Sequence, residues 1–301
     1  MNAKIIFNPK SGTGAFLKKF ETVLGKLILN NVFHNVKSYK IDDDLDLNTA
    51  IIENADFYDI YIAVGGDGTI HNVINKMAVN DIKVPILIIP AGTVNDFGNY
   101  LKIPKEEDKL YELIKDFKVQ NIDLCMANSK YFINVAAAGL LADIAITTPK
   151  QYKSMLGSLA YYAHGISEVP KQLFKDLKFK FTTKENEFDL DAYLFLILNT
   201  SNAGGFTNMA PKACLDDGLF DVCIIKKSFI ISAASVFFKL FSGEHINDNN
   251  VLYFQTDYLK VECINNDDLI LDLDGEHGGF FPCEFKIAKN KLNIVIPKEI
   301  Q

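Results

Sequence analysis

The sequence predicts an α/β domain with a parallel sheet over residues 1–122 and a β-rich, sandwich-like domain over residues 123–301. In the first part, apolar runs end in polar, glycine-containing turns and are followed by helical periodicity, which is typical of β-α units in a parallel sheet. In the second part, short β-branched or aromatic runs follow one another between Asn, Asp and Gly, which favours antiparallel strands. We leave open that the final residues pack back on the first domain.

The composition supports two globular cores and excludes several classes of protein. The 301 residues are 49% hydrophobic and 12% aromatic, which is enough apolar material for two buried cores. The net charge of −7 argues against broad nucleic-acid binding. No signal-peptide pattern is found, and the apolar runs are shorter than the roughly 20 residues that a membrane span needs. We therefore expect a cytoplasmic protein with no transmembrane segment and no nucleic-acid partner.

Cysteine and arginine usage narrow the chemistry further. The five cysteines are scattered with no Cys-x-x-Cys pair, so neither a zinc site nor a disulfide framework is indicated. All 31 basic residues are lysine. A phosphate site in this chain must therefore use backbone N–H groups, a metal ion and the point charge of lysine, because no arginine fork exists.

The expected elements of the first domain alternate between strands and helices. Strands are predicted at residues 3–7, 36–41, 60–64, 84–89 and 121–124, and helices at residues 15–30, 47–54, 105–116 and from about residue 70 to residue 77. Polar turns follow three of these strands, at residues 8–14, 65–69 and 90–97. Because parallel strands share one carboxyl edge, we expect the three turns to converge on a single crevice, although each turn alone could be an ordinary β-α connection.

The turn after the third strand favours phosphate chemistry most directly. Gly65, Gly66 and Gly68 let bare backbone N–H groups approach an anion, and the following helix directs its N-terminus toward it. Asp67 lies inside this turn. A carboxylate beside a phosphate is favourable when a divalent cation with hard oxygen ligands lies between them.

The second half is expected to form an antiparallel sandwich or a partly open barrel. The predicted strands are residues 131–135, 178–182, 188–199, 219–225, 259–264, 269–273, 285–288 and 292–296.

Three motifs in the first half occur in a fixed order: Asn-Pro-Lys-Ser-Gly at residues 8–12, Gly-Gly-Asp-Gly-Thr at residues 65–69 and Pro-Ala-Gly-Thr-Val-Asn-Asp-Phe at residues 90–97. Together they resemble the catalytic domain of the diacylglycerol kinase and sphingosine kinase family of lipid kinases. The second of these alone would also suit NAD kinases or phosphofructokinases, which have a similar crevice.

Motifs in the second half extend the resemblance over nearly the whole chain. Residues 134–139, 215–221, 243–245 and 273–279 are similar to the β-rich domain of the soluble diacylglycerol kinases of Gram-positive bacteria.

The resemblance implies transfer of the γ-phosphoryl group of ATP to a lipid hydroxyl, with Mg²⁺ as cofactor. Diacylglycerol, giving phosphatidic acid, is the expected substrate. The alternatives are another lipid alcohol, such as phosphatidylglycerol or a sphingoid base, and a regulator that binds lipid or nucleotide without catalysis. The implied catalytic residues are Asp67 and Asp96, which would organise Mg²⁺, and Asp274 and Glu276, either of which could be the base.

The resemblance also implies the binding residues. The nucleotide contacts are expected at Asn8, Pro9, Lys10, Ser11, Gly12, Lys40, Gly65, Gly66, Asp67, Gly68, Thr69, Ile70, His71, Asn72, Thr93 and Asn95. A second, structural Mg²⁺ is expected at Cys214, Asp217 and Leu219, with carbonyls beside the single carboxylate. Two positions depart from the family pattern: His71-Asn72 stands where many relatives carry Asn-Glu, and Lys40 stands where a small hydroxyl residue is expected.

A lipid substrate requires a membrane surface. Residues 147–184 carry seven lysines against two acidic residues, together with apolar and aromatic residues. Because each lysine near an anionic lipid surface contributes about 1 kcal/mol, we expect this segment to bring the protein transiently to the inner face of the membrane. A solvated helix packed on the sandwich is the alternative. Homodimerisation is left open, because no stretch identifies a contact surface.

Overall fold

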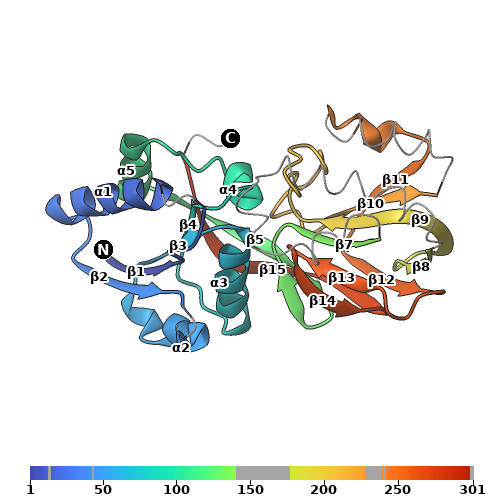
Figure 1. Ribbon diagram of the computed structural model, residues 1–301, viewed down its shortest axis with the longest axis horizontal. Coiled ribbons are helices and arrows are strands. Elements are labelled where there is room, and N and C mark those ends of the chain that lie inside the picture. Colours follow the sequence, from blue (N-terminus) through green and yellow to red (C-terminus); the bar gives the residue numbers. More distant parts are fainter. Residues whose placement is uncertain (13–14, 43, 140–176, 228–238, 240–241, 299–301) are drawn as a thin grey trace. The chain divides into compact units, whose positions relative to one another are not determined.

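The computed structural model describes residues 1–12, 15–42, 44–139, 177–227, 239 and 242–298 (Figure 1). The chain divides into two compact units, Met1–Ile122 with Asn290–Gln301, and Asp123–Lys289. It passes from the first unit to the second within strand β5 (Lys118–Ala127) and returns within strand β15 (Cys283–Ile296).

The first unit alternates strands with helices. Its elements are β1 (Asn2–Phe7), α1 (Ala15–Leu29), β2 (Asn35–Lys40), α2 (Leu47–Ile52), the 3-10 helix η1 (Ala55–Phe57), β3 (Ile60–Gly65), α3 (Asp67–Val79), β4 (Ile86–Pro90), α4 (Asp96–Tyr100) and α5 (Glu107–Lys115).

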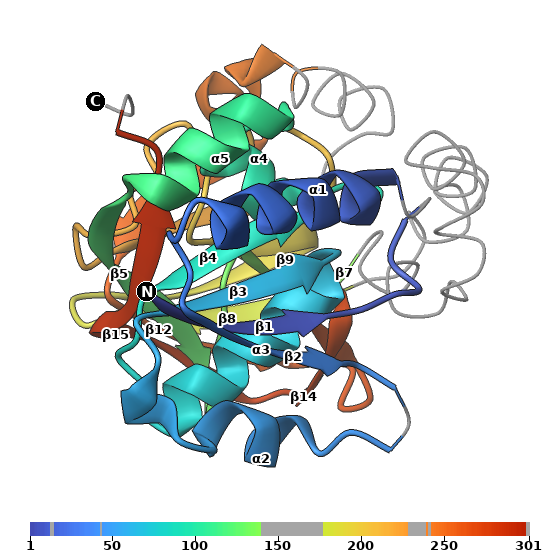
Figure 2. The same ribbon diagram turned by 90° about the vertical axis from the view of Figure 1, so that its left-hand side faces the viewer.

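The sheet of this unit is parallel, as predicted, in the order β2-β1-β3-β4, and the end of β15 pairs in parallel with β4 through Ile294 and Ile86. Helices α1 and α5 cover one face of the sheet, and α2 and α3 cover the other (Figure 2). Every residue of β3 is buried, which explains why its sequence is continuously apolar and does not alternate.

Helix α3 confirms the predicted apolar stripe, because Ile70, Val73, Ile74 and Met77 are all buried. The helix begins three residues before that stripe, at Asp67, and its N-cap is Gly66. The Gly-Asp-Gly-Thr turn is therefore the first turn of a helix, with its backbone N–H groups at the positive end of the helix dipole.

The second unit is built of antiparallel strands. Its further elements are β6 (Lys130–Phe132), β7 (Val135–Gly139), β8 (Lys178–Thr182), β9 (Glu187–Leu198), β10 (Phe220–Lys226), the 3-10 helix η2 (Glu244–Asn247), β11 (Val251–Thr256), β12 (Tyr258–Cys263), β13 (Ile270–Leu273) and β14 (Glu276–Phe280).

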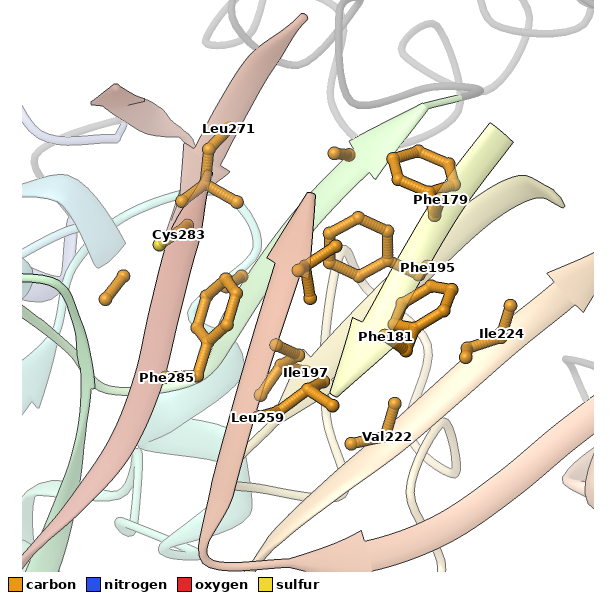
Figure 3. Close-up of a cluster of buried hydrophobic side chains, with 14 of the residues drawn as sticks. Phe179, Phe181, Phe195, Ile197, Val222, Ile224, Leu259, Leu271, Cys283 and Phe285 are labelled. Carbon is orange, nitrogen blue, oxygen red and sulfur yellow. The ribbon is translucent and has the colours of Figure 1, made fainter. Parts of the chain in front are cut away.

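Strand β9 organises this unit, because its two halves pair with different strands. Its first half pairs with β8, which continues to β12 and β15. Its second half pairs with β7 on one side and β10 on the other, and these continue to β13 and β14, and to β11. Side chains from both sets of strands enclose a core rich in phenylalanine, including Phe179, Phe181, Phe195 and Phe285 (Figure 3).

Several sequence predictions for individual strands were wrong. Residues 131–135 form two strands, β6 and β7, because the chain breaks at Ile133 and Asn134. Residues 285–288 and 292–296 belong to one strand, β15, although the polar residues between them read as a turn. Helix α4 and strands β11 and β14 were not predicted; β14 reads Glu-His-Gly-Gly-Phe and has no alternating apolar pattern.

Within the described ranges, no helix has both the length and the apolar character needed to cross a membrane. Residues 147–176, which are most of the predicted membrane-docking segment 147–184, lie outside the described residues.

Candidate active site

The three polar turns of the first unit meet at the carboxyl edge of its sheet, as predicted. We call residues 8–12, 65–69 and 91–95 the glycine cradle. A Cβ on Gly92 would lie 2.5 Å from the Cα of Gly66, and a Cβ on Gly12 would lie 2.3 Å from the carbonyl oxygen of Ala91. Because these distances are below any normal contact, the three turns approach one another more closely than side chains would allow. Gly12 also has a φ of 57°, which favours glycine.

Hydrogen bonds join the first turn to the second. The Asn8 backbone N–H donates to the carbonyl of Val64 at 3.0 Å, and the Asn8 side-chain amide donates to Thr69 Oγ1 at 3.1 Å. The Ser11 hydroxyl accepts from the Gly66 N–H at 3.3 Å. Asn8, Ser11 and Thr69, all predicted site residues, therefore lie together.

Asn95 joins the second turn to the third. Its side chain accepts from the Gly92 N–H at 2.7 Å and donates to the Gly92 carbonyl at 2.8 Å. Its backbone N–H donates to Asp67 Oδ2 at 2.8 Å, and its φ is 59°, in the left-handed region that asparagine tolerates. Asn95 thus shapes the cradle and orients Asp67, and Asp96 follows it as the first residue of α4.

The cradle fits a magnesium nucleotide. Gly66 caps α3 without a side-chain hydrogen bond, so the first turn of the helix presents backbone N–H groups and no capping oxygen. Asp67 stands in that turn with one oxygen held by Asn95. The backbone N–H groups of this site can bind phosphate, and the oriented carboxylate can bind a Mg²⁺ ion that is also bound to the phosphate.

Five further predicted nucleotide contacts are placed as follows. Lys10, Asn72 and Thr93 are exposed, whereas the side chain of Ile70 is buried in the core, so only its backbone could meet a ligand. Lys40 ends β2 and pairs with Asp42, with 3.6 Å between Nζ and Oδ2.

In the second unit, Asp274 lies in the turn between β13 and β14, and Glu276 directly follows that turn. The Asp274 carboxylate accepts three backbone hydrogen bonds, from Ile133 at 2.7 Å and from Asn134 and Val135 at 2.9 Å each. Glu276 is the first residue of β14, lies opposite Leu273 and is half-buried. The structure therefore distinguishes two carboxylates that the sequence left equivalent.

A buried polar cluster surrounds Asn134, one of the residues that donate to Asp274, and the sequence did not predict it. Thr200 Oγ1 donates to Asn134 Oδ1 at 3.0 Å and to the carbonyl of Asn202 at 2.9 Å. The Asn199 N–H donates to the carbonyl of Asn134 at 2.8 Å. All four side chains are at most 7% exposed. The available signal was an Asn-Thr-Ser-Asn run directly after the apolar strand β9.

The turn that was predicted to bind a structural Mg²⁺, residues 214–219, donates backbone hydrogen bonds to two carboxylates. Asp217 Oδ1 accepts from the Leu219 N–H at 2.9 Å, and Asp123 Oδ2 accepts from the Gly218 N–H at 2.9 Å. The Cys214 thiol donates to Asp216 at 3.0 Å. In the part of the chain that the structure describes, no three His, Cys, Asp or Glu side chains gather to hold a metal. A site here would thus depend on carbonyl oxygens beside Asp217.

Comparisons with known proteins match nearly the whole chain. Residues 2–127 match the family described as diacylglycerol kinase catalytic domain, and residues 134–296 match the YegS C-terminal NAD kinase beta sandwich-like domain. The diacylglycerol kinase of Bacillus subtilis (strain 168) is 35% identical over 299 residues, which are 99% of this chain and 97% of that protein. The diacylglycerol kinase of Staphylococcus haemolyticus (strain JCSC1435) is 33% identical over 298 residues, covering 99% of this chain and 89% of that protein.

A solved structure shares the fold. The crystal structure of a putative diacylglycerol kinase from Bacillus anthracis str. Sterne superposes with a TM-score of 0.82 at 24% identity, covering 100% of this chain and 96% of that chain. The predicted combination of an α/β domain with a β-sandwich domain is confirmed.

Proposed function

Since this chain belongs to the diacylglycerol kinase family, we infer that it is a lipid kinase that transfers the γ-phosphoryl group of ATP to diacylglycerol and so forms phosphatidic acid. The observation that carries this proposal is the glycine cradle, where three turns pack backbone against backbone beside an oriented carboxylate. Such a site favours a polyphosphate, because the first turn of α3 offers backbone N–H groups beside glycines that carry no side chain.

The first unit supplies the nucleotide site in this proposal. The first-turn amides of α3 would bind the phosphates, and Asp67 and Asp96 would hold the metal ion. When bound, Mg²⁺ neutralises the charge that develops on the phosphates. Because the chain has no arginine, we assign the remaining positive charge to lysine, and propose the exposed Lys10 in the first turn for this role.

The second unit supplies the base. We assign this role to Glu276, because the three N–H donors on Asp274 favour its ionised form and occupy three of its roughly four lone-pair sites. The hydroxyl oxygen of the lipid attacks the γ-phosphorus, the bond from that phosphorus to the bridging β-γ oxygen breaks, and ADP leaves. Glu276 accepts the hydroxyl proton.

The substrate lies in a membrane, so we propose that the protein visits the membrane surface during turnover. Three of the seven lysines of residues 147–184 are described, and each has an acidic partner: Lys178 with Asp189, Lys180 with Glu187 and Lys184 with Asp257. The three described lysines are therefore already paired with acidic side chains. Activity that does not respond to anionic lipid in mixed vesicles would contradict this part.

Radiolabelled phosphate transfer tests the function. Wild-type protein is given labelled ATP with diacylglycerol, phosphatidylglycerol, sphingosine or undecaprenol in mixed micelles, with Mg²⁺ present or chelated. We expect label in phosphatidic acid alone, and only with Mg²⁺. Label on a different lipid would change the substrate, and no label on any lipid with ATP still bound would favour a regulator.

A further inference from the structure

The turn that carries Glu276 is fixed by its neighbour Asp274. The Asp274 carboxylate accepts hydrogen bonds from three successive backbone N–H groups, those of residues 133, 134 and 135, at 2.7 to 2.9 Å. Residues 133–134 are the connection between β6 and β7, where the ladder with neighbouring strands is interrupted. Ile133 and Asn134 are 2% and 6% exposed, so their amides need a partner inside the protein.

The backbone of the same turn also donates two hydrogen bonds. The Asp274 N–H donates to the carbonyl of Val135 at 2.9 Å, and the Gly275 N–H donates to Asp272 Oδ1 at 2.9 Å. Asp274 and Gly275 have φ values of 53° and 85°, so both stand in the left-handed region. The hydrogen bonds thus hold a turn that an L-residue adopts reluctantly, directly before Glu276.

The segment that Asp274 binds is itself anchored. Asn134 accepts from the Thr200 hydroxyl through its side chain at 3.0 Å, and from the Asn199 N–H through its carbonyl at 2.8 Å. Both donors follow β9, the strand that organises the unit. Asp274 therefore ties the turn to the most connected part of the sandwich.

We propose that Asp274 is a positioning residue, whose ionised carboxylate locks the Glu276 turn to the β6–β7 connection and so fixes the base for proton transfer. This rests on the proposed function, because it takes Glu276 as the base. Loss of the lock leaves Glu276 chemically intact and misplaced. A displacement of about 1 Å at a reacting group costs about 10²-fold in rate.

Asp274→Asn tests the proposal, because asparagine keeps the shape and the tolerance for positive φ while its amide cannot accept three N–H bonds. We expect unchanged Mg²⁺-ATP affinity, kcat about 10²-fold lower, and an acidic limb of the kcat profile at the same pH as in wild type. Glu276→Gln should lose about 10²- to 10⁴-fold and lose the acidic limb itself.

The matched control is Asp81→Asn, the same substitution at another aspartate with a φ of 53°, which lies two residues after the end of α3, is exposed, and pairs with Lys83 and Lys291. It should leave activity at the wild-type level.

Amide hydrogen exchange gives a readout that does not depend on activity. Asp274→Asn should accelerate exchange at residues 133–135, and Asp81→Asn should not. Unchanged exchange at residues 133–135 in Asp274→Asn would overturn the inference, whatever the activity of the wild type. The inference would also be overturned if the acidic limb of the kcat profile were lost in Asp274→Asn and kept in Glu276→Gln. A wild type that phosphorylates no lipid would overturn the proposed function alone.

If Asp274→Asn does not fold, Thr200→Val is the second test. Faster exchange at residue 134 together with a lower kcat would support the positioning role, and wild-type values of both would contradict it.

Discussion

Single atoms decide the geometry of the glycine cradle. Gly92 has room for no Cβ, because that atom would lie 2.5 Å from the Cα of Gly66 and 2.9 Å from Asn95 Oδ1. The same Oδ1 accepts the Gly92 N–H. One methyl group would therefore separate two turns and disturb the residue that orients Asp67.

We accordingly expect Gly92→Ala to fold and to bind Mg²⁺-ATP about 10²-fold more weakly, since a small displacement of binding groups has effects of that size. Titration calorimetry measures the affinity. Gly25→Ala is the control: Gly25 lies within α1, and nothing lies within 4 Å of the position that a Cβ would take. The Gly25→Ala variant should have a free energy of unfolding about 0.5–1 kcal/mol higher than wild type. If Gly92→Ala bound Mg²⁺-ATP as tightly as wild type, the close approach of the two turns would be contradicted.

A buried carboxylate next to the predicted metal turn gives a second test at this scale. Asp221 is 1% exposed, and burial raises its pKa, while hydrogen bonds from the Tyr253 hydroxyl and the Gln255 amide oppose the rise. Since the raised pKa means that the folded protein holds its proton to higher pH than the unfolded chain, ionisation of Asp221 costs stability as pH rises.

Removal of the Tyr253 hydroxyl should increase that cost. We expect Tyr253→Phe to lower the free energy of unfolding by about 1–3 kcal/mol at pH 7 and by less at pH 4.5, where Asp221 is more protonated. Urea unfolding at the two pH values measures this. Tyr258→Phe, whose hydroxyl is 3.4 Å from Glu284, should stay within about 0.5 kcal/mol of wild type, and an equal loss at both pH values for Tyr253→Phe would exclude the carboxylate as the cause.

At the scale of elements, a buried lysine closes the C-terminal end of helix α2. Lys4 is fully buried in β1, and its ammonium donates to the carbonyls of Ala50, Ile51 and Glu53 at 2.8, 3.1 and 2.6 Å. The rings of Tyr58 and Tyr61 lie 4.7 and 4.9 Å from its nitrogen. A cation at this end satisfies carbonyls that the helix leaves unpaired and complements the helix dipole.

Burial lowers the pKa of Lys4 from 10.5 to about 8, against the opposing charge of Glu53. Between pH 8 and 10.5 the unfolded chain therefore holds more protons on this lysine, so its contribution to the free energy of unfolding rises with pH. The pKa of Tyr61 is raised by burial, which has the opposite effect only at higher pH.

Lys4→Met should remove this dependence. We expect the difference in urea midpoint between wild type and Lys4→Met to be more in favour of wild type at pH 9.5 than at pH 8. The exposed Lys19 in α1 provides the control, and Lys19→Met should follow wild type. A wild type and Lys4→Met with parallel pH profiles would show that Lys4 titrates normally in the folded protein.

At the scale of the whole molecule, the first unit depends on the end of the chain. Residues 290–301 belong to it, and Leu292, Ile294, Val295 and Ile296 are at most 3% exposed. Burial of four aliphatic side chains contributes about 6–12 kcal/mol, which is comparable to the entire stability of a domain.

A chain that ends at residue 289 should therefore lose ATP binding and the thermal transition of the first unit, while the β-rich unit keeps its own transition. Calorimetry and nucleotide titration measure both. A chain that ends at residue 298 is the control and should match the full chain. Full ATP affinity in the shorter chain would mean that the segment is dispensable for the first unit.

The sequence by itself determined the features that are local or periodic. The parallel β-α units, the stripe of α3 and the three glycine turns could be predicted, because strand and helix periods and the φ freedom of glycine act within a few residues of the chain. The family followed from the order of those turns and the motifs of the second half.

Only the tertiary structure decided the pairings between distant residues. The burial of Lys4 against α2, the anchoring of Asp67 by Asn95 and the three amides on Asp274 join residues 28 to 141 positions apart. Asp274 and Glu276 are two residues apart and read alike in the sequence. They differ in the structure because a break between β6 and β7, itself invisible in the apolar pattern, directs its backbone donors at only one of them.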